Sequence, residues 1–289
     1  ASAKPLRPFK VGAHLQTRLA YGNEQTPPAP SFQARRVRLN GQWRQDGLRL
    51  ALKVAFEEGR SRLMNAYATY SLNKNLSLRA GQFKRITNLD YLIGSYSQRI
   101  YERSIIGNKI DSQRDIGVAL RGRWLGKRLN TNVVVFNGNG GGTEGNSNSD
   151  LRYEARIEAH LGKRVRYERR RIGNRPRAML GAGFGYMRMD DGTKNATGTQ
   201  LWTRATRQTM SGSVVLQAWR HELRAEWLKR AQDAIDPIAG AEAPAASLTH
   251  AERDGGYVQW AWSLPVSTLP FLTPVQASAR AQLYRRTGA

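Results

Sequence analysis

The chain has 289 residues, with 46 Lys and Arg against 22 Asp and Glu, and it has no cysteine. The lack of cysteine excludes disulfides, cysteine-based zinc sites and thiol catalysis. The formal net charge of +24 implies an anionic partner, which can be nucleic acid, acidic lipid or small anions.

No pattern of catalytic or metal-binding residues emerges from the sequence. The four histidines are not spaced like metal ligands, and Ser, His and Asp do not occur with the spacing of a catalytic triad. We therefore predict that the protein is not an enzyme and needs no metal or other cofactor.

Alternation of apolar and polar residues dominates the chain, and this two-residue period predicts strands. It is clearest in "VGAHLQTRLAY" (11–21), "LRLALKVAF" (48–56), "LRYEARIEAHL" (151–161) and "VQASARAQL" (275–283). The predicted strands cover residues 9–21, 31–43, 48–57, 62–72, 76–84, 114–124, 129–137, 151–161, 177–189, 202–219, 222–230, 256–264 and 275–286.

One segment has a competing helical interpretation. "WRHELRAEWLKRA" (219–231) is rich in helix-forming residues. Leu223, Ala225 and Trp227 nevertheless alternate with charged residues, and strands are predicted on both sides. We therefore predict a strand over 222–230.

The links between the predicted strands alternate between long and short. The long ones are 22–30, 58–61, 85–113, 138–150, 190–201 and 231–255, whereas most of the others have only two to four residues. This alternation is typical of an up-and-down outer-membrane barrel, with short periplasmic turns and longer outer loops. Two links, 162–176 and 265–274, are long where short ones are expected.

A soluble β-sandwich is the alternative fold, because its strands also alternate. Three features favour a membrane barrel. The polar faces are crowded with arginine, the strands of about ten residues fit a tilted bilayer crossing, and aromatic residues lie near strand ends as an interfacial girdle requires. These aromatic residues are Tyr21, Trp43, Trp124, Tyr186, Trp219 and Trp227.

Seven segments, in this order and spacing, resemble the phosphate-selective porin O and P family of outer-membrane channels. The resemblance covers the stretch Phe32–Leu161, and the segments are "SFQARRVRLNGQW", "LMNAYATY", "LSLRAGQFK", "IYERS", "RDIGVALRG", "VVVFNGNG" and "DLRYEARIEAHL". The resemblance implies an all-β, sixteen-stranded, homotrimeric barrel in the bacterial outer membrane that passes phosphate or related anions. It also implies contact with outer-membrane lipid and lipopolysaccharide, and no nucleic-acid partner.

The resemblance gives the third long link, 85–113, a role, because in trimeric porins that loop folds into the barrel and narrows it. Its aromatic and aliphatic residues are then expected to pack on the inner wall, while its cations stand in the lumen. The alternative is an outer loop whose cations meet water or lipopolysaccharide. The expected packing residues are Tyr91, Leu92, Ile93, Tyr96, Tyr101, Ile105 and Ile106, and the expected lumen residues are Lys84, Arg85, Arg99, Arg103 and Lys109.

Further anion-binding residues are expected on the polar faces of the strands. An arginine fork binds phosphate oxygens bidentately and stays charged at any working pH, and conduction needs several weak sites along the pore. Arg152 and Arg156 are poorer candidates, because Glu154 and Glu158 alternate with them. The candidates are Arg36, Arg38, Arg49, Lys53, Arg79, Arg121 and Arg123.

The whole chain, 1–289, is predicted to be a single barrel domain. About thirteen strands are visible where the family implies sixteen, and the end "YRRTGA" lacks a closing aromatic residue, so we expect C-terminal strands to be missing. Two other functions stay open. One is a structural barrel subunit of an envelope complex, and the other is a basic nucleic-acid-binding β protein.

Overall fold

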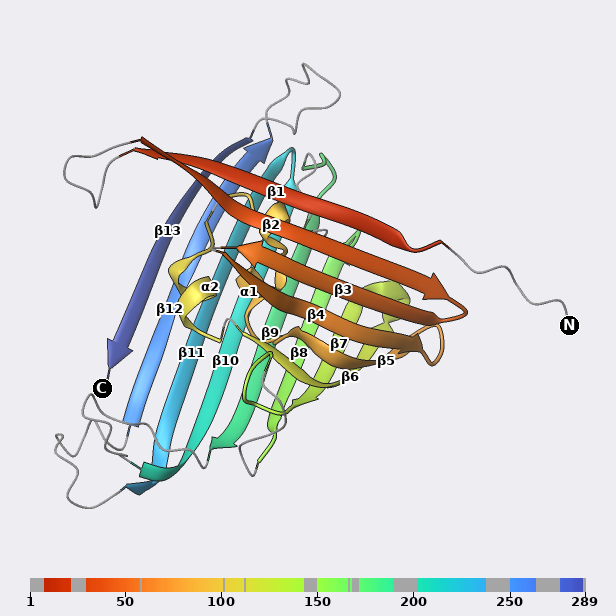
Figure 1. Cartoon of the computed structure of the whole chain (residues 1–289). Helices are drawn as coiled ribbons and strands as arrows, with labels where there is room; N and C mark the ends of the chain where they lie inside the picture. The colour runs from red at the N-terminus through yellow and green to blue at the C-terminus, as the bar shows by residue number, and fades with distance from the viewer. Residues whose placement is uncertain are drawn as a thin grey trace, which may run out of the picture.

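The computed structural model describes residues 8–21, 30–57, 59–100, 102–111, 113–142, 150–165, 167, 172–189, 202–237, 250–263 and 276–287. In this part the chain forms a single antiparallel sheet of thirteen strands in sequence order, so the predicted all-β up-and-down fold is confirmed (Figure 1). Among the described residues, β1 and β13 lie at the two edges and do not pair with each other. The strands are β1 (Lys10–Tyr21), β2 (Pro30–Gln45), β3 (Leu48–Glu57), β4 (Arg60–Ser71), β5 (Leu76–Lys84), β6 (Arg114–Trp124), β7 (Leu129–Phe136), β8 (Arg152–Gly162), β9 (Arg177–Met189), β10 (Trp202–Ala218), β11 (His221–Pro237), β12 (His250–Ser263) and β13 (Gln276–Thr287).

The structure resolves the helix-or-strand question and corrects several bounds. Residues 222–230 lie inside β11, so the predicted strand is confirmed. The predicted long link 231–255 is shorter than expected, because β11 continues to Pro237 and β12 already begins at His250. The link 265–274, which is also long where a short link is expected, lies outside the described residues.

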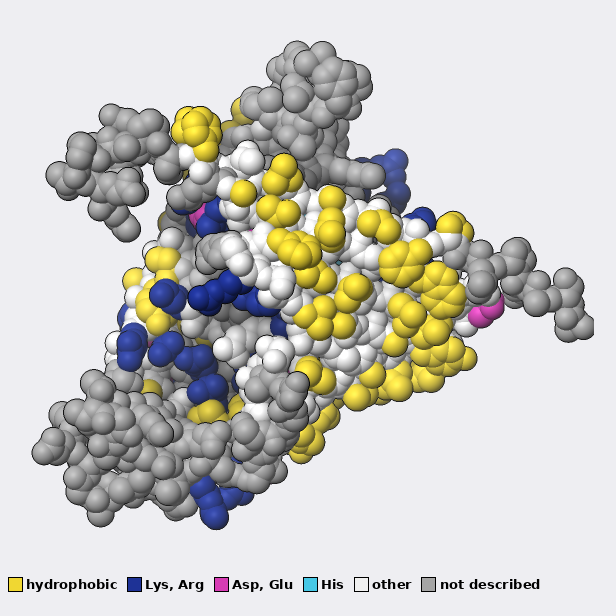
Figure 2. All heavy atoms as spheres, viewed as in Figure 1, with side chains coloured by type: hydrophobic (Ala, Val, Ile, Leu, Met, Phe, Trp, Pro, Cys, Tyr) yellow, Lys and Arg dark blue, Asp and Glu magenta, His cyan; other side chains and the backbone are white. Residues whose placement is uncertain are grey.

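The outer face of the sheet is apolar, which rules out the sandwich alternative. Val11, Leu15 and Leu19 of β1 are exposed, and Trp219, in the tight turn between β10 and β11, is 72% exposed. Figure 2 shows apolar side chains spread over the outer surface of the strands. A sandwich would bury this face against a second sheet, whereas a lipid-facing sheet leaves it open. No helix in the described part of the chain is long and apolar enough to cross a membrane.

The link 85–113, called the inner loop below, lies on the concave side of the sheet (Figure 1). It contains three short helices that the sequence did not predict: α1 (Leu89–Leu92), η1 (Ser95–Ser97) and α2 (Ile105–Lys109). Asn88 and Ser104 begin α1 and α2 by accepting hydrogen bonds from the backbone N–H groups of Tyr91 and Gly107.

The inner loop also connects the two ends of the open sheet. The carboxylate of Glu102 lies 2.6 Å from Arg35 of β2, and its carbonyl oxygen accepts a hydrogen bond of 2.9 Å from Arg280 of β13. A bulge makes the first contact possible, because Arg35 is the extra residue where the β1–β2 register shifts at Gln16. The loop therefore bridges β2 and β13 across the interior.

A substitution at Gly81 tests how the backbone of β5, part of the wall behind the inner loop, contributes to stability. Its φ is +119°, and a Cβ there would lie 2.3 Å from the carbonyl oxygen of Ala66. We expect Gly81→Ala to lower the free energy of unfolding by roughly 1–3 kcal/mol through backbone strain, measured by denaturant unfolding in detergent micelles. Gly212→Ala in β10 is the matched control, because a Cβ there meets nothing within 4 Å. Equal stability of the two variants would contradict the prediction.

Candidate functional site

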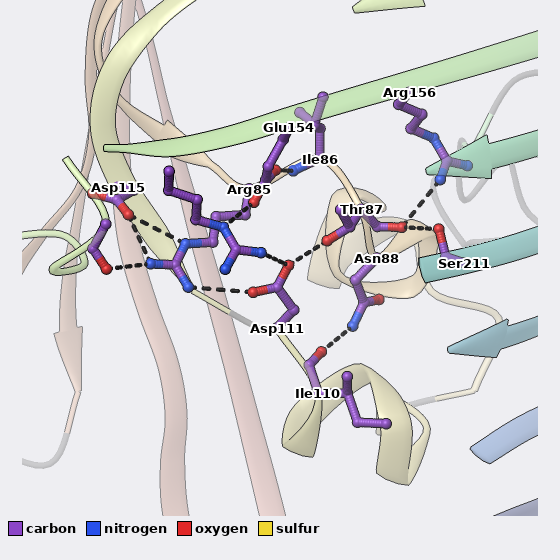
Figure 3. Close-up of polar contacts among 12 residues, drawn as sticks. Arg85, Ile86, Thr87, Asn88, Ile110, Asp111, Asp115, Glu154, Arg156 and Ser211 are labelled. Carbon is purple, nitrogen blue, oxygen red and sulfur yellow. Dashed lines mark hydrogen bonds and ion pairs between the residues drawn. The ribbon is translucent and has the colours of Figure 1, made fainter. Parts of the chain in front are cut away.

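A buried network of ion pairs fixes both ends of the inner loop (Figure 3). Arg85, at the start of the loop, lies 2.7 Å from Asp115 of β6 and 3.2 Å from Asp111 at the end of the loop. Arg152 of β8 contacts the second oxygen of Asp111 at 2.7 Å, and Thr87 donates a hydrogen bond to the same oxygen. Two loop ends and two strands thus share one charge cluster.

The state of Asp111 follows from its neighbours. Burial by itself raises the pKa of this carboxyl, but the guanidinium groups of Arg152 and Arg85 outweigh burial and lower the pKa to about 2. Asp111 is therefore ionised at neutral pH and compensates the charge of both arginines.

Side chains of the wall satisfy the backbone of the inner loop. Glu226 of β11 accepts hydrogen bonds from the amides of Leu89 at 2.5 Å and Asp90 at 2.9 Å. Glu154 of β8 accepts a bond of 2.7 Å from the amide of Ile86. Because buried backbone groups are costly when unpaired, these contacts select one position for the loop.

Apolar contacts complete the attachment of the loop to the wall, in three separate clusters. Each cluster buries two apolar residues, all of the loop except Phe83 at the end of β5, against side chains of the strands and, in the second cluster, against Val165 of the link between β8 and β9, which removes apolar area from water. The clusters are Phe83 and Ile86 with Ala119, Val134 and Phe136; Leu89 and Ile93 with Val165, Met179 and Val215; and Ile106 and Ile110 with Leu228 and Tyr257.

Between the inner loop and strands β2 to β8 lies a cavity of about 590 Å³, called the main cavity below. Among the described residues that line it, Glu158 is the only carboxylate. Eleven cations line the same cavity: Arg38, Lys53, Arg62, Arg79, Lys84, Arg103, Arg114, Arg121, Arg123, Arg156 and Arg164.

Carbonyl oxygens of α1 and the residue after it orient two of these cations. The ammonium of Lys84 donates to the carbonyls of Tyr91, Leu92 at 3.1 Å and Ile93 at 3.3 Å. The guanidinium of Arg103 donates to the carbonyls of Ile93 at 2.9 Å and Asp90 at 3.2 Å. Carbonyl dipoles orient a cation without cancelling its charge.

Aromatic rings and amides orient other members of the cluster. Arg79 lies 4.1 Å from the ring centroid of Tyr67 and donates to Thr69. Arg114 donates to Asn65 at 2.9 Å and to the hydroxyl of Tyr91 at 2.8 Å. Two members do have carboxylate partners, since Arg38 pairs with Glu57 and Arg156 with Glu158, at 2.6 and 2.9 Å.

Two further cavities continue from the main cavity toward the end of the sheet that carries the tight turns 46–47, 72–75 and 125–128, called the short-turn end. The first, of about 380 Å³, shares Arg79, Arg121 and Arg123 with the main cavity. The second, of about 1080 Å³, shares Arg123 and Arg164 and is called the turn-side cavity below. Cations therefore line three adjoining cavities between the inner loop and the short-turn end.

The structure brings most of the predicted site residues together. Seven line the main cavity, and Arg49 lines the smaller cavity beside it. Arg36 faces the interior near the loop, donating to Gln16 at 2.5 Å and lying 3.9 Å from Glu102. The seven are Arg38, Lys53, Arg79, Lys84, Arg103, Arg121 and Arg123.

Three loop cations lie elsewhere. Arg85 belongs to the buried ion-pair network, and Arg99 is buried against Glu222 of β11 at 3.3 Å. Lys109, at the end of α2, is exposed and lines none of the three cavities. Both arginines are neutralised by carboxylates that the local sequence does not reveal.

Of the loop residues expected to pack on the inner wall, some are buried and others are exposed. Tyr91, Ile93 and Ile106 are buried, whereas Tyr96 and Ile105 are exposed. Leu92 is half-buried and lines the main cavity, and Tyr101 lies outside the described residues.

Sequence reasoning missed three cavity residues: Arg62, Arg114 and Arg164. Arg114 has the parity of Val118 and Leu120, whose side chains are exposed on the outer face, so alternation assigns it to lipid. It turns inward because it is the first residue of β6, next to the loop. Arg164 lies in the link 162–176, which the sequence analysis found to be long where a short one is expected. Among the described residues, no group of three His, Asp or Glu side chains is placed to hold a metal ion.

Residues 13–273 match the family model described as phosphate-selective porin O and P. The chain belongs to this family. The porin is accordingly a protein of the bacterial outer membrane, and the predicted family and location are confirmed. No curated protein matches its sequence.

Solved structures share the fold of this porin at low sequence identity. The outer-membrane expressed OmpT of Vibrio cholerae aligns with a TM-score of 0.57 and 12% identity, over 97% of this chain and 77% of that one. The in-vitro folded OmpT of Vibrio cholerae, described as a trimer form, aligns with a TM-score of 0.57 and 13% identity, over 98% and 80% of the two chains. At such identities the likeness shows the fold alone.

Proposed function

We propose that this porin is an anion-selective diffusion channel that passes phosphate and related small anions through the main cavity. The observation that carries the proposal is the cavity lining, in which eleven Lys and Arg side chains face a single carboxylate. An anion that enters a narrow pore loses hydration, and fixed cations along the wall compensate for that loss.

The partners of these cations support the proposal further. An arginine paired with a carboxylate is nearly neutral to a passing ion, whereas one held by carbonyls, amides or rings keeps its field. Arg79, Arg103 and Arg114 are of the second kind. Arg85 and Arg99, which have carboxylate partners, do not line the cavity. Apart from Arg38 and Arg156, which pair with Glu57 and Glu158, the charge is therefore largely uncompensated where an ion would pass.

The inner loop, in this proposal, narrows the pore, because it forms one wall of the main cavity and strands form the other. The guanidinium forks suit the oxygen geometry of phosphate. The number of cations suits weak, successive binding, which lets the ion leave. We also propose a homotrimer in contact with outer-membrane lipid, supported by the trimer form of a structural neighbour and by the apolar outer face.

The test is the reversal potential of the purified porin in a planar bilayer under a potassium chloride gradient, followed by addition of phosphate. We expect an anion-selective potential and a chloride current that low phosphate concentrations block. Anion selectivity without block would leave a general anion channel and remove the phosphate preference. A non-selective current would overturn the proposal, and the absence of channels would favour a structural barrel.

A further inference from the structure

The link between β8 and β9, residues 163–176, departs from the other described connections at the short-turn end. Those connections, 46–47, 72–75, 125–128 and 219–220, are tight turns. The β8–β9 link leaves the strand at Gly162, whose φ is +74° and whose added Cβ would lie 2.9 Å from the carbonyl oxygen of Pro176. The glycine allows the two ends of the link to meet closely.

In the first half of the link, Val165 reaches the interior. Val165 is 2% exposed and packs with Leu89 and Ile93 of the inner loop, and with Met179 and Val215 of the wall. A turn that only met solvent would not bury a valine against a loop that arrives from the opposite end of the barrel. The link and the inner loop therefore support each other in the middle of the pore.

The second half of the link is tied to the wall. The amide of Ile172 donates to the hydroxyl of Ser263 in β12 at 3.0 Å, and Ile172 itself is buried. The carbonyl oxygen of Asn174 accepts a hydrogen bond of 3.1 Å from the amide of Trp219. Val165 in the first half of the link and Ile172 in the second are therefore both held against the rest of the protein.

This position places two side chains between two cavities. Arg164 and Tyr167 each line both the main cavity and the turn-side cavity. The guanidinium of Arg224 in β11 lies 5.7 Å from the ring centroid of Tyr167, which holds the ring against the wall. An ion that moves from the main cavity toward the short-turn end along this route passes Arg164.

We propose that Arg164 and Tyr167 of the β8–β9 link form a second constriction of the pore, on the short-turn side of the inner loop, and that Arg164 is a selectivity-determining residue for the anions that cross it. This proposal rests on the proposed function in one respect only, namely that the permeant ion is negatively charged. The placement of the link in the pore rests on the burial of Val165 and on the two shared cavities. The guanidinium of Arg164 would pass an anion from one cavity to the next.

Because the chain has no cysteine, single cysteine variants give a direct test of position. Arg164→Cys is incorporated into planar bilayers and treated with 2-sulfonatoethyl methanethiosulfonate, and mass spectrometry confirms the modification. We expect the single-channel conductance to fall by about twofold or more, because a bulky anionic group then occupies a constriction. The matched control is Arg175→Cys in the same link, which is exposed and lines none of the three cavities.

Modification of Arg164→Cys without any change in conductance would overturn the proposal, and so would an equal fall in the Arg175→Cys control. If Arg164→Cys does not insert, Lys163→Cys, which lines the turn-side cavity, takes its place with the same expectation. Selectivity is then compared in Arg164→Gln and Arg175→Gln, and only the former should lower the anion-to-cation permeability ratio. A wild-type channel without anion selectivity would overturn the proposed function, whereas the thiol experiment would still decide whether the link constricts the pore.

Discussion

The variant Arg121→Glu should lose most of the anion selectivity of the wild-type channel. Arg121 lines both the main cavity and the smaller cavity beside it. Two unit charges 4 Å apart interact by about 1 kcal/mol in water, so reversing one charge shifts the energy of a nearby anion by about 2 kcal/mol. Salt screens part of this effect, and we expect the chloride-to-potassium permeability ratio to fall roughly tenfold, as each 1.4 kcal/mol is a factor of ten.

The reversal potential under a potassium chloride gradient measures this ratio. Arg60→Glu is the control, because Arg60 is exposed at the start of β4 and lines none of the three cavities. The same change in net charge should leave its reversal potential close to that of the wild type. If both variants lost selectivity equally, the overall charge of the protein and not the cavity would set selectivity.

The variant Asp111→Asn should destabilise the porin and release the inner loop. Asp111 contacts the guanidinium groups of Arg85 and Arg152, both of which are buried. Removing one partner of a buried ion pair typically costs about 3–5 kcal/mol, because a charge is left uncompensated. We expect a lower unfolding midpoint in denaturant, and a larger, noisier single-channel conductance as the loop leaves the lumen.

Asp46→Asn in the exposed β2–β3 turn is the control for this variant. Asp46 has a φ of +44°, which asparagine also tolerates. The free energy of unfolding of Asp46→Asn should stay close to that of the wild type. An Asp111→Asn channel with wild-type stability and conductance would show that the network does not hold the loop.

The carboxylate of Asp111 also predicts how the stability of the porin changes with pH. The folded pKa of Asp111, about 2, lies below its ordinary value of 3.8, because Arg152 and Arg85 outweigh burial. A depressed folded pKa contributes stability that is complete above the unfolded value and is lost as the pH falls through the folded value. The stability difference between wild type and Asp111→Asn should therefore shrink as the pH falls from 4 toward 2. A difference independent of pH would contradict this assignment.

Which residues face lipid and which face the interior was largely predictable from the sequence. A strand places successive side chains on opposite faces, so the period of two is local and needs no knowledge of distant residues. This is why β11 was predicted against its helical composition, and why Arg38, Lys53, Arg79, Arg121 and Arg123 were assigned to the polar face. The motifs of the family were equally local, whereas the link 58–61, predicted to be long, spans only residues 58–59 between β3 and β4.

Whether a cation in the interior carries a free charge was decided only by the tertiary structure. Lys84 and Arg85 are adjacent and equally charged in the sequence, yet Lys84 lines the cavity on carbonyl oxygens while Arg85 is buried between Asp111 and Asp115. Arg114 lines the cavity although strand alternation assigns it to the outer face, and Arg164 lines it from the exceptionally long link 162–176. The sequence by itself determined the faces of the strands, because alternation is set by neighbouring residues. The tertiary structure determined the charge along the route, because compensation of a buried cation depends on carboxylates and carbonyls that lie far away in the chain.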